Sequence, residues 1–159
     1  MMFQLDIVLY QPEIPQNTGN IARTCAALDT GLHLIKPLGF SLESREVKRA
    51  GLDYWPDVTL FVWSSFAEFH AACRPTPEEI VLFSKSGKHP FWNLPKPEKL
   101  YLIFGSETRG IPEDIRQKFS EENIFHIPIK NNIRSLNLST SVGIALYESL
   151  RPFPSFHEY

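Results

Sequence analysis

The sequence has few cysteines, little net charge and no long hydrophobic run. Each of these absences excludes a class of protein or a kind of binding partner. No apolar run reaches the roughly 18 residues that cross a membrane, and no basic segment followed by an apolar one marks a secretory signal. We therefore expect a cytoplasmic protein with no membrane partner. The formal net charge of −2 provides no overall positive field to attract nucleic acid. Any RNA-binding surface must therefore be local.

Metal and nucleotide motifs are missing as well. The two cysteines, Cys25 and Cys73, have no CxxC partner, and the five histidines lack the spacing of metal ligands. We expect buried or half-buried thiols in a reducing compartment, and no metal site. The sequence contains no GxGxxG, Walker A, HExxH or nucleophile-elbow motif. It therefore lacks the patterns that mark dehydrogenases, P-loop NTPases, zinc proteases and serine hydrolases.

The apolar segments predict one α/β domain over residues 1–159, without a repeat or a separating linker. Several apolar runs are nearly continuous, which is typical of strands covered on both faces. The predicted strands are 5–10, 32–36, 58–62, 80–83, 100–104 and 124–129. The predicted helices are 19–30, 43–50, 66–72, 112–119 and 137–150. Because helices alternate with strands, we expect a mainly parallel sheet with helices on both faces.

The last predicted helix carries two faces that could be buried. Its apolar stripe consists of Leu138, Val142, Ala145 and Leu146, and a second, mixed face consists of Thr140, Ile144 and Tyr147. A helix with two such faces needs two packing partners. The spacing alone leaves open whether the second partner is another subunit or the proline-rich C-terminal tail.

A polar segment after the first predicted strand includes a charged residue, Arg23. Asn17, Thr18 or Asn20 could cap the helix that follows. In a helix beginning at 19, Arg23 leaves the buried stripe and lies in the first turn beside Asn20. A cation gains little at this positive end of the helix dipole, so Arg23 there suggests an anionic ligand.

Two further polar segments follow predicted strands, at 104–112 and at 127–139. In the first, Gly105 allows a ligand to approach the backbone and Pro112 suits a first helical turn. In the second, Ser135 and Asn137 precede the last helix, where either could be a simple cap. Ligands of open α/β sheets bind beyond the carboxyl ends of strands. Taken together, the three segments therefore predict a binding site.

The three segments resemble the motifs of the SpoU branch of the SPOUT class of RNA methyltransferases. The matching patterns are Asn17-x-Gly19-Asn20-x-x-Arg23, then Phe104-Gly105-x-Glu107-x-x-Gly110-Ile111-Pro112, then Ile127-Pro128 with Ser135-x-Asn137-Leu138-Ser139. The resemblance covers essentially the whole chain. The lead-in at 10–15, the segment 49–54 and the lack of an added RNA-binding domain make it most similar to the minimal tRNA wobble-position 2′-O-methyltransferases.

The resemblance implies a fold detail, a methyl donor and an assembly. It implies a C-terminal trefoil knot that binds S-adenosylmethionine (AdoMet), largely through backbone groups. Gly105, Ile127 and Ser135 would line that site, with Phe83 as a less closely fixed fourth member. It also implies a homodimer whose active sites form at the subunit interface, which gives Tyr147 a supporting role there.

The implied reaction transfers a methyl group to the ribose 2′-hydroxyl of the wobble pyrimidine of tRNA. Arginine is effectively always protonated, so Arg23 cannot readily act as a general base. We expect Arg23 to hold a neighbouring phosphate and stabilise the developing alkoxide, while a phosphate oxygen or water accepts the proton. Asn20 would orient the hydroxyl or Arg23. Glu107 and Asn137 would support the loops.

Local cations could provide the RNA surface, although charges on a surface helix are often only solvated. The main candidates are Arg45, Lys48 and Arg49, and weaker ones are Lys85, Lys88, Arg109, Lys130 and Arg134.

Three other functions compete with this interpretation. Thr18, Gly19 and Asn20 resemble a phosphate-binding turn at a helix N-terminus, which would suit a flavodoxin-like FMN electron carrier. A non-catalytic RNA-binding protein could keep the same fold, although the presence of Asn20 and Arg23 argues against it. Within the methyltransferases, the substrate could be another tRNA position or ribosomal RNA.

Overall fold

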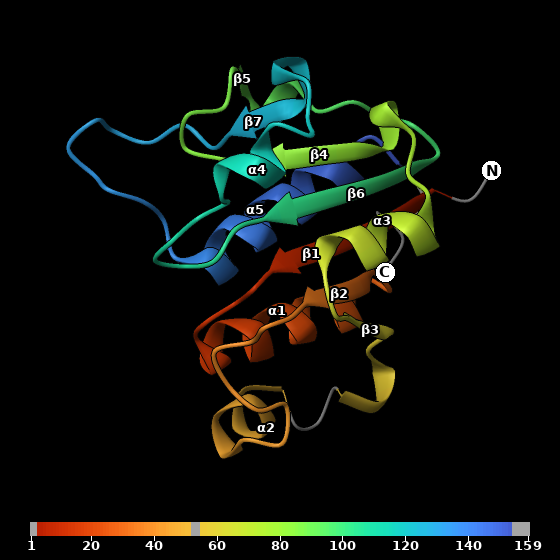
Figure 1. The fold of residues 1–159 in the computed structure, drawn as a ribbon, viewed down its shortest axis with the longest axis vertical. Helices are drawn as coiled ribbons and strands as arrows, with labels where there is room; N and C mark the ends of the chain where they lie inside the picture. Colours follow the sequence, from red (N-terminus) through yellow and green to blue (C-terminus); the bar gives the residue numbers. More distant parts are fainter. Residues whose placement is uncertain (1–2, 52–54, 154–159) are drawn as a thin grey trace.

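The computed structural model describes residues 3–51 and 55–153. Its strands form one seven-stranded parallel sheet (Figure 1). The strand order is β3-β2-β1-β6-β4-β7-β5. The strands are β1 (Gln4–Tyr10), β2 (Gly31–Ile35), β3 (Leu60–Trp63), β4 (Ile80–Phe83), β5 (His89–Pro90), β6 (Lys99–Phe104) and β7 (Ile124–His126). The α-helices are α1 (Pro15–Ala27), α2 (Arg45–Gly51), α3 (Phe66–Cys73), α4 (Glu113–Arg116) and α5 (Leu138–Leu150).

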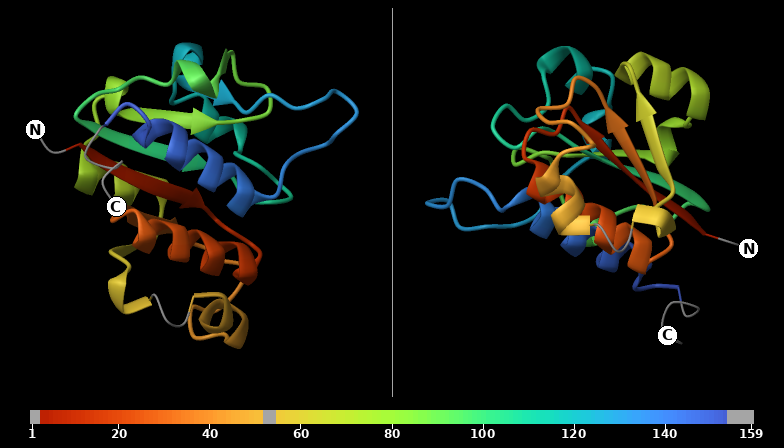
Figure 2. Two further views of the ribbon diagram at one scale, coloured as in Figure 1. Left: turned by 180° about the vertical axis from the view of Figure 1, so that it is seen from behind. Right: turned by 90° about the horizontal axis from the view of Figure 1, so that it is seen from below.

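Helices cover both faces of the sheet, as predicted (Figure 2). On one face, α1 and α5 lie side by side and bury Ile21 and Leu146 against alternate residues of the central strands. On the other face, α3 and α4 bury Phe69 and Ile115. Because both faces are covered, the central strands are apolar at almost every position. This explains why near-continuous apolar runs were the correct signal for them.

The first helix begins one turn earlier than predicted, so the expected polar loop at 17–23 is wrong. Pro15 occupies the first helical position, and the N-cap residue Ile14 makes no side-chain cap hydrogen bond. Proline suits this position because its fixed φ is helical and its missing N–H is not needed. Asn17 is therefore buried inside the helix, and Arg23 lies in the third turn instead of the first. The argument from the helix dipole does not apply to Arg23.

The remaining differences concern where elements end. The strand predicted over 124–129 ends at His126, close before Pro128, which cannot donate to a sheet. The connection at 88–99, predicted to be extended surface chain, contains the short strand β5, which pairs with β7. Two residues that include a proline make no recognisable strand pattern, and such a strand fits only at a sheet edge. The segment 127–137 forms a long loop that projects from the sheet (Figure 1).

A buried polar chain links the three strands at the other end of the sheet. Nε2 of His33 on β2 lies 2.9 Å from Oδ2 of Asp6 on β1. Nε1 of Trp63 on β3 donates to Nδ1 of His33 at 3.0 Å. Because each buried polar group has a partner, the chain fixes the order of these strands without leaving an unsatisfied group.

Both cysteines are free thiols in helices, as predicted. Cys25 is buried in α1 and Cys73 is half-buried at the end of α3, and burial raises the pKa of both thiols. Within residues 3–51 and 55–153 there is no group of three or more side chains that could hold a metal ion. Nor does any helix in these ranges have the length and apolar character needed to cross a membrane.

Candidate active site

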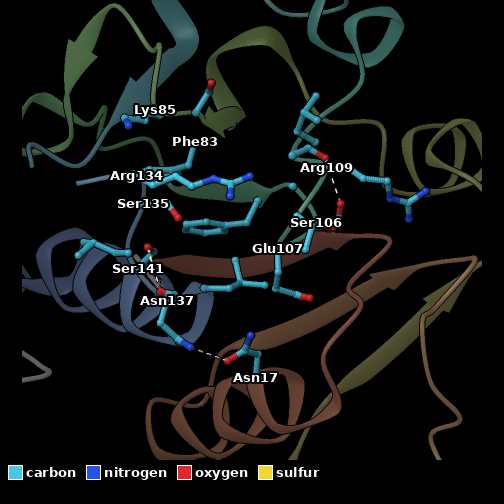
Figure 3. Close-up of a pocket in the computed structure, with 18 of the residues that line it drawn as sticks. Asn17, Phe83, Lys85, Ser106, Glu107, Arg109, Arg134, Ser135, Asn137 and Ser141 are labelled. Carbon is cyan, nitrogen blue, oxygen red and sulfur yellow. Dashed lines mark hydrogen bonds between the residues drawn. The ribbon is translucent and has the colours of Figure 1, made fainter. Parts of the chain in front are cut away.

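A cavity of about 690 Å³ lies at the carboxyl ends of β4, β6 and β7, the edge of the sheet where the sequence predicted a site (Figure 3). Its volume suits a ligand the size of a nucleoside. All four residues predicted to contact the methyl donor line it, and so do two of the predicted supporting residues. These six are Phe83, Gly105, Ile127, Ser135, Glu107 and Asn137.

Two phenylalanines at the ends of neighbouring strands form an aromatic wall of this cavity. The rings of Phe83 and Phe104 stack with centroids 4.7 Å apart and an interplanar angle of 4°. Both side chains are more than nine-tenths buried. Their parallel arrangement presents a rigid apolar surface, which can contact the flat face of a heteroaromatic ligand.

The loop after β6 is closed tightly by its own backbone. Ser106 and Gly110 exchange two backbone hydrogen bonds, of 3.2 and 2.9 Å. A Cβ atom on Gly105 would lie 2.4 Å from the carbonyl carbon of Gly110, so no side chain fits there. The expected reason for Gly105 was close approach of a ligand. The structure shows that the glycine is needed because the loop folds back on itself.

Glu107 joins this loop to the segment that leads into α1. Its carboxylate accepts hydrogen bonds from the backbone N–H groups of Glu13, at 2.8 and 3.1 Å, and of Ile14, at 2.8 Å. Burial raises the pKa of the Glu107 carboxyl, and these hydrogen bonds partly oppose that rise. The first turn of the helix is thus fixed to the cavity wall.

Glu13 makes the reciprocal connection. Its carboxylate accepts from the Thr108 hydroxyl at 2.7 Å and from the Thr108 backbone N–H at 3.2 Å. These hydrogen bonds lower the pKa of Glu13. Nε of Arg109 lies 3.7 Å from the same carboxylate. The segment before α1 and the loop after β6 therefore hold each other through two carboxylates.

Asn137 connects α5 to α1 at another edge of the cavity. Its Oδ1 caps α5 by accepting from the backbone N–H of Ser139 at 2.9 Å, and its Nδ2 donates to Oδ1 of Asn17 at 3.0 Å. Figure 3 shows the two asparagines pointing toward each other beside the cavity. Asn137 is thus a helix cap that also links two helices.

The structure does not bring the predicted catalytic pair to this cavity. Asn20 and Arg23 lie one helical step apart on the exposed side of α1, and neither lines the cavity. Asn20 instead lines a second cavity, between α1 and α2. Tyr147 on α5 is 60% exposed and also lies outside the large cavity. Within one chain, the predicted donor site and the predicted catalytic residues are separate.

Some cavity residues were missed by sequence reasoning or given another role. Asn17 was treated as a helix cap, but it is 5% exposed and lines the cavity. The signal for its position is Pro15, which suits a first helical position and so places Asn17 in the first turn of the helix. Arg134 was considered only for RNA, yet it reaches into the cavity beside Ser135 (Figure 3). Lys85 also lines the cavity and ties the long loop to β4 by donating to the Ile133 carbonyl at 3.0 Å.

Comparison with known proteins gives one consistent result. Residues 4–147 match the model of the SpoU rRNA Methylase family. The chain is 47% identical over 146 residues to a tRNA (cytidine(34)-2′-O)-methyltransferase of Methylovorus glucosotrophus, covering 92% of this chain and 94% of that protein. A solved structure described as giving insights into the 2-OH methylation of C/U34 on tRNA is 47% identical. It superposes with a TM-score of 0.86 over 96% of this chain and 98% of the other.

Proteins with lower sequence identity share the same fold. An AdoMet-bound rRNA methyltransferase from Sinorhizobium meliloti is 22% identical to this chain and superposes with a TM-score of 0.85, over 96% of this chain and 58% of the other. At that identity, the likeness concerns the fold alone. The family match, by contrast, spans nearly the whole chain and includes all three polar segments. The chain therefore belongs to the SpoU methylase family.

Proposed function

We propose that this protein transfers a methyl group from AdoMet to the ribose 2′-hydroxyl of the wobble pyrimidine, position 34, of tRNA. The observation that carries this conclusion is the 47% identity, over nearly the full length of both chains, to the Methylovorus glucosotrophus enzyme. Family membership sets aside the flavodoxin-like alternative. A tRNA substrate also fits the cytoplasmic location expected from the sequence.

The large cavity fits AdoMet. Its aromatic wall, Phe83 and Phe104, suits the adenine ring, and the tight loop from Gly105 to Gly110 borders it with backbone polar groups. AdoMet, when bound, supplies a sulfonium methyl group that is already electrophilic. The protein therefore needs to hold the donor and orient the acceptor.

Arg23 and Asn20 are our candidates for acting on the acceptor. Arg23 would hold the phosphate beside the target ribose and stabilise the negative charge that develops on the 2′-oxygen. As the 2′-oxygen forms its bond to the methyl carbon and the carbon–sulfur bond breaks, the hydroxyl proton passes to a phosphate oxygen or water. Asn20 would orient the hydroxyl. The guanidinium remains protonated throughout.

We also propose that the active site is completed by a second copy of the chain. Asn20 and Arg23 lie outside the cavity of their own chain, on the helix that packs beside α5. Two exposed apolar residues belong to this helix pair: Tyr147 of α5 is 60% exposed, and Ile14, the N-cap residue of α1 that also lines the cavity, is 40% exposed. A two-fold interface over these helices would bury those side chains and could bring Arg23 to the partner's cavity.

Mixing two inactive variants tests this arrangement. Arg23→Ala should remove the acceptor side of the site, and Gly105→Val should disrupt the loop at the cavity. Unfolded and refolded together, the two should regain about a quarter of wild-type activity, since half of the dimers are mixed and each has one intact site. A site formed within one chain predicts that the mixture stays inactive. AdoMet binding by the Arg23 variant shows that it is folded.

The reaction itself is tested with methyl-labelled AdoMet and bulk tRNA, followed by mapping of the labelled nucleotide. We expect label on the ribose at position 34, and no label with Arg23→Ala. Label at another tRNA position, or transfer only to ribosomal RNA, would keep the methyltransferase chemistry and replace the substrate. Failure to bind AdoMet at all would contradict the proposed reaction.

A further inference from the structure

The second cavity has a volume of about 460 Å³ and lies between α1 and α2. Gln16 and Asn20, four residues apart on α1, form one wall. Arg45 and Arg49, four residues apart on α2, form the facing wall. We call this cavity the arginine cleft. The lining of the cleft thus includes two amide side chains from α1 and two guanidinium side chains from α2.

The two helices that form the cleft, α1 and α2, are already in close contact beside it. A small movement of either helix therefore cannot close the cleft. A Cβ atom on Gly19 would lie 2.4 Å from Cβ of Ala50 and 3.1 Å from the Val47 carbonyl oxygen. Val47 is fully buried and anchors α2 against the rest of the protein. The spacing of the two walls is therefore set by core packing.

The charges of the cleft favour a singly charged anion. Neither arginine has an ion pair or hydrogen bond to another described residue. Glu46 also lines the cleft. The two arginines and this glutamate together give the cleft a net charge of one positive unit. This balance matches a phosphodiester, which carries one negative charge. Guanidinium groups also bind phosphate oxygens through paired N–H donors.

Lys48 lies on the same helix but does not belong to this site. It does not line the cleft, and its Nζ lies 3.0 Å from Oε2 of Glu43. The sequence grouped Lys48 with Arg45 and Arg49 as RNA contacts. The structure separates the lysine from the two arginines.

We infer that the arginine cleft binds a backbone phosphate of the RNA substrate, next to the nucleotide that is methylated. This inference rests on the proposed function, because Asn20 belongs both to the cleft and to the pair proposed to act on the ribose hydroxyl. A ribose held at Asn20 has its neighbouring phosphates within one backbone unit, which brings one of them to the arginines. The cleft would therefore position the substrate strand and leave the methyl donor untouched.

The test compares Arg45→Ala/Arg49→Ala with Lys48→Ala, which removes a positive charge from the same helix outside the cleft. We expect the double variant to raise the KM for tRNA about tenfold and to leave the AdoMet affinity unchanged. Its log Kd should depend less steeply on log salt concentration, by about 0.7 for one phosphate contact in a single strand. Lys48→Ala should change neither quantity. Arg45→Lys/Arg49→Lys should keep the wild-type salt dependence, because it keeps both charges.

Two results would overturn the inference. One is a double alanine variant whose KM and salt dependence equal those of the wild type. The other is an equal effect of Lys48→Ala, which would indicate a diffuse field in place of a site. Both results require a wild-type protein that methylates tRNA. A wild type that transfers no methyl group to tRNA would instead contradict the proposed function itself.

Discussion

Glu13 and Glu107 determine how the start of α1 is held against the cavity. Each carboxylate accepts hydrogen bonds from the other's segment, Glu107 from backbone N–H groups before α1 and Glu13 from Thr108. Sequence reasoning predicted a bracing role for Glu107. It did not find the partner, because residues 94 positions apart in the chain show no sequence relation to each other.

Replacing Glu107 with Gln should destabilise the protein. A carboxamide oxygen at the place of Oε2 could still accept from both backbone N–H groups, but the NH2 group would then face the Glu13 N–H, and the charge that strengthens these hydrogen bonds would be lost. We expect the free energy of unfolding to fall by about 1–2 kcal/mol and AdoMet binding to weaken. Urea unfolding and calorimetric titration measure the two effects. Glu113→Gln, at an exposed position of α4, is the matched control, and equal stability of both variants would contradict the bracing role.

Glu13 should contribute a pH-dependent part of the stability. Its folded-state pKa lies below the ordinary value of 4.5, because Thr108 donates hydrogen bonds to the carboxylate. The contribution is therefore fully present above about pH 4.5 and is lost as the pH falls through the lower folded-state pKa. Glu13→Gln should be less stable than the wild type at pH 7, and the difference should shrink in acid. Urea midpoints measured across this range give the comparison, and a constant difference would count against it.

At the scale of elements, the sequence predicted the central strands and the long helices well but misplaced the start of α1. Buried parallel strands are marked by their own apolar runs, so β1, β4 and β6 were found close to their observed bounds. The start of α1 was missed because Asn17 and Asn20 are good helix caps and suggested a later start. Pro15, which also suits a first helical position, marks the true start. The sheet order could not be predicted, since apolar runs do not specify which strands are neighbours.

The contact between α1 and α2 predicts an unusual response to Gly19→Ala. Alanine in a helix interior normally stabilises by about 1 kcal/mol. Here its Cβ would lie 2.4 Å from Cβ of Ala50, and overpacking costs about 1–3 kcal/mol. We therefore expect a net loss of stability and a raised KM for tRNA, as α2 shifts.

The matched rescue is the double variant Gly19→Ala/Ala50→Gly, which removes the opposing methyl group. It should recover the KM and part of the stability, measured in the same urea and kinetic experiments. A single Gly19→Ala variant that is more stable than the wild type would show that the helices can separate without cost.

For the molecule as a whole, the cavity was predictable from the sequence and its separation from Arg23 was not. The family resemblance assigned Gly105, Ile127 and Ser135 to one donor site, and all three line one cavity. It could not show that Asn20 and Arg23 lie elsewhere, because that depends on how α1 packs. The expected subunit interface and the C-terminal knot remain predictions from the family resemblance.

The proposed interface predicts that Tyr147→Glu gives monomers. Tyr147 is 60% exposed on α5, and a carboxylate there would be buried without a partner in a dimer. Sedimentation should show a monomer that still binds AdoMet but no longer methylates tRNA. Val62→Glu is the control, since Val62 is also exposed, at 38%, on the edge strand β3 and not on α1 or α5. An active monomer would remove the need for a second copy.

An indole N–H can only donate a hydrogen bond, so the Trp63 contact requires Nδ1 of His33 to be the unprotonated nitrogen. The imidazole proton then resides on Nε2, directed at Asp6. The Trp63 indole is thus held by a side chain as well as by the pairing of β2 with β3, and loss of this hydrogen bond would loosen the edge strand β3. In a variant that keeps Trp63 as its single tryptophan, the ultraviolet emission would therefore report whether that strand is attached.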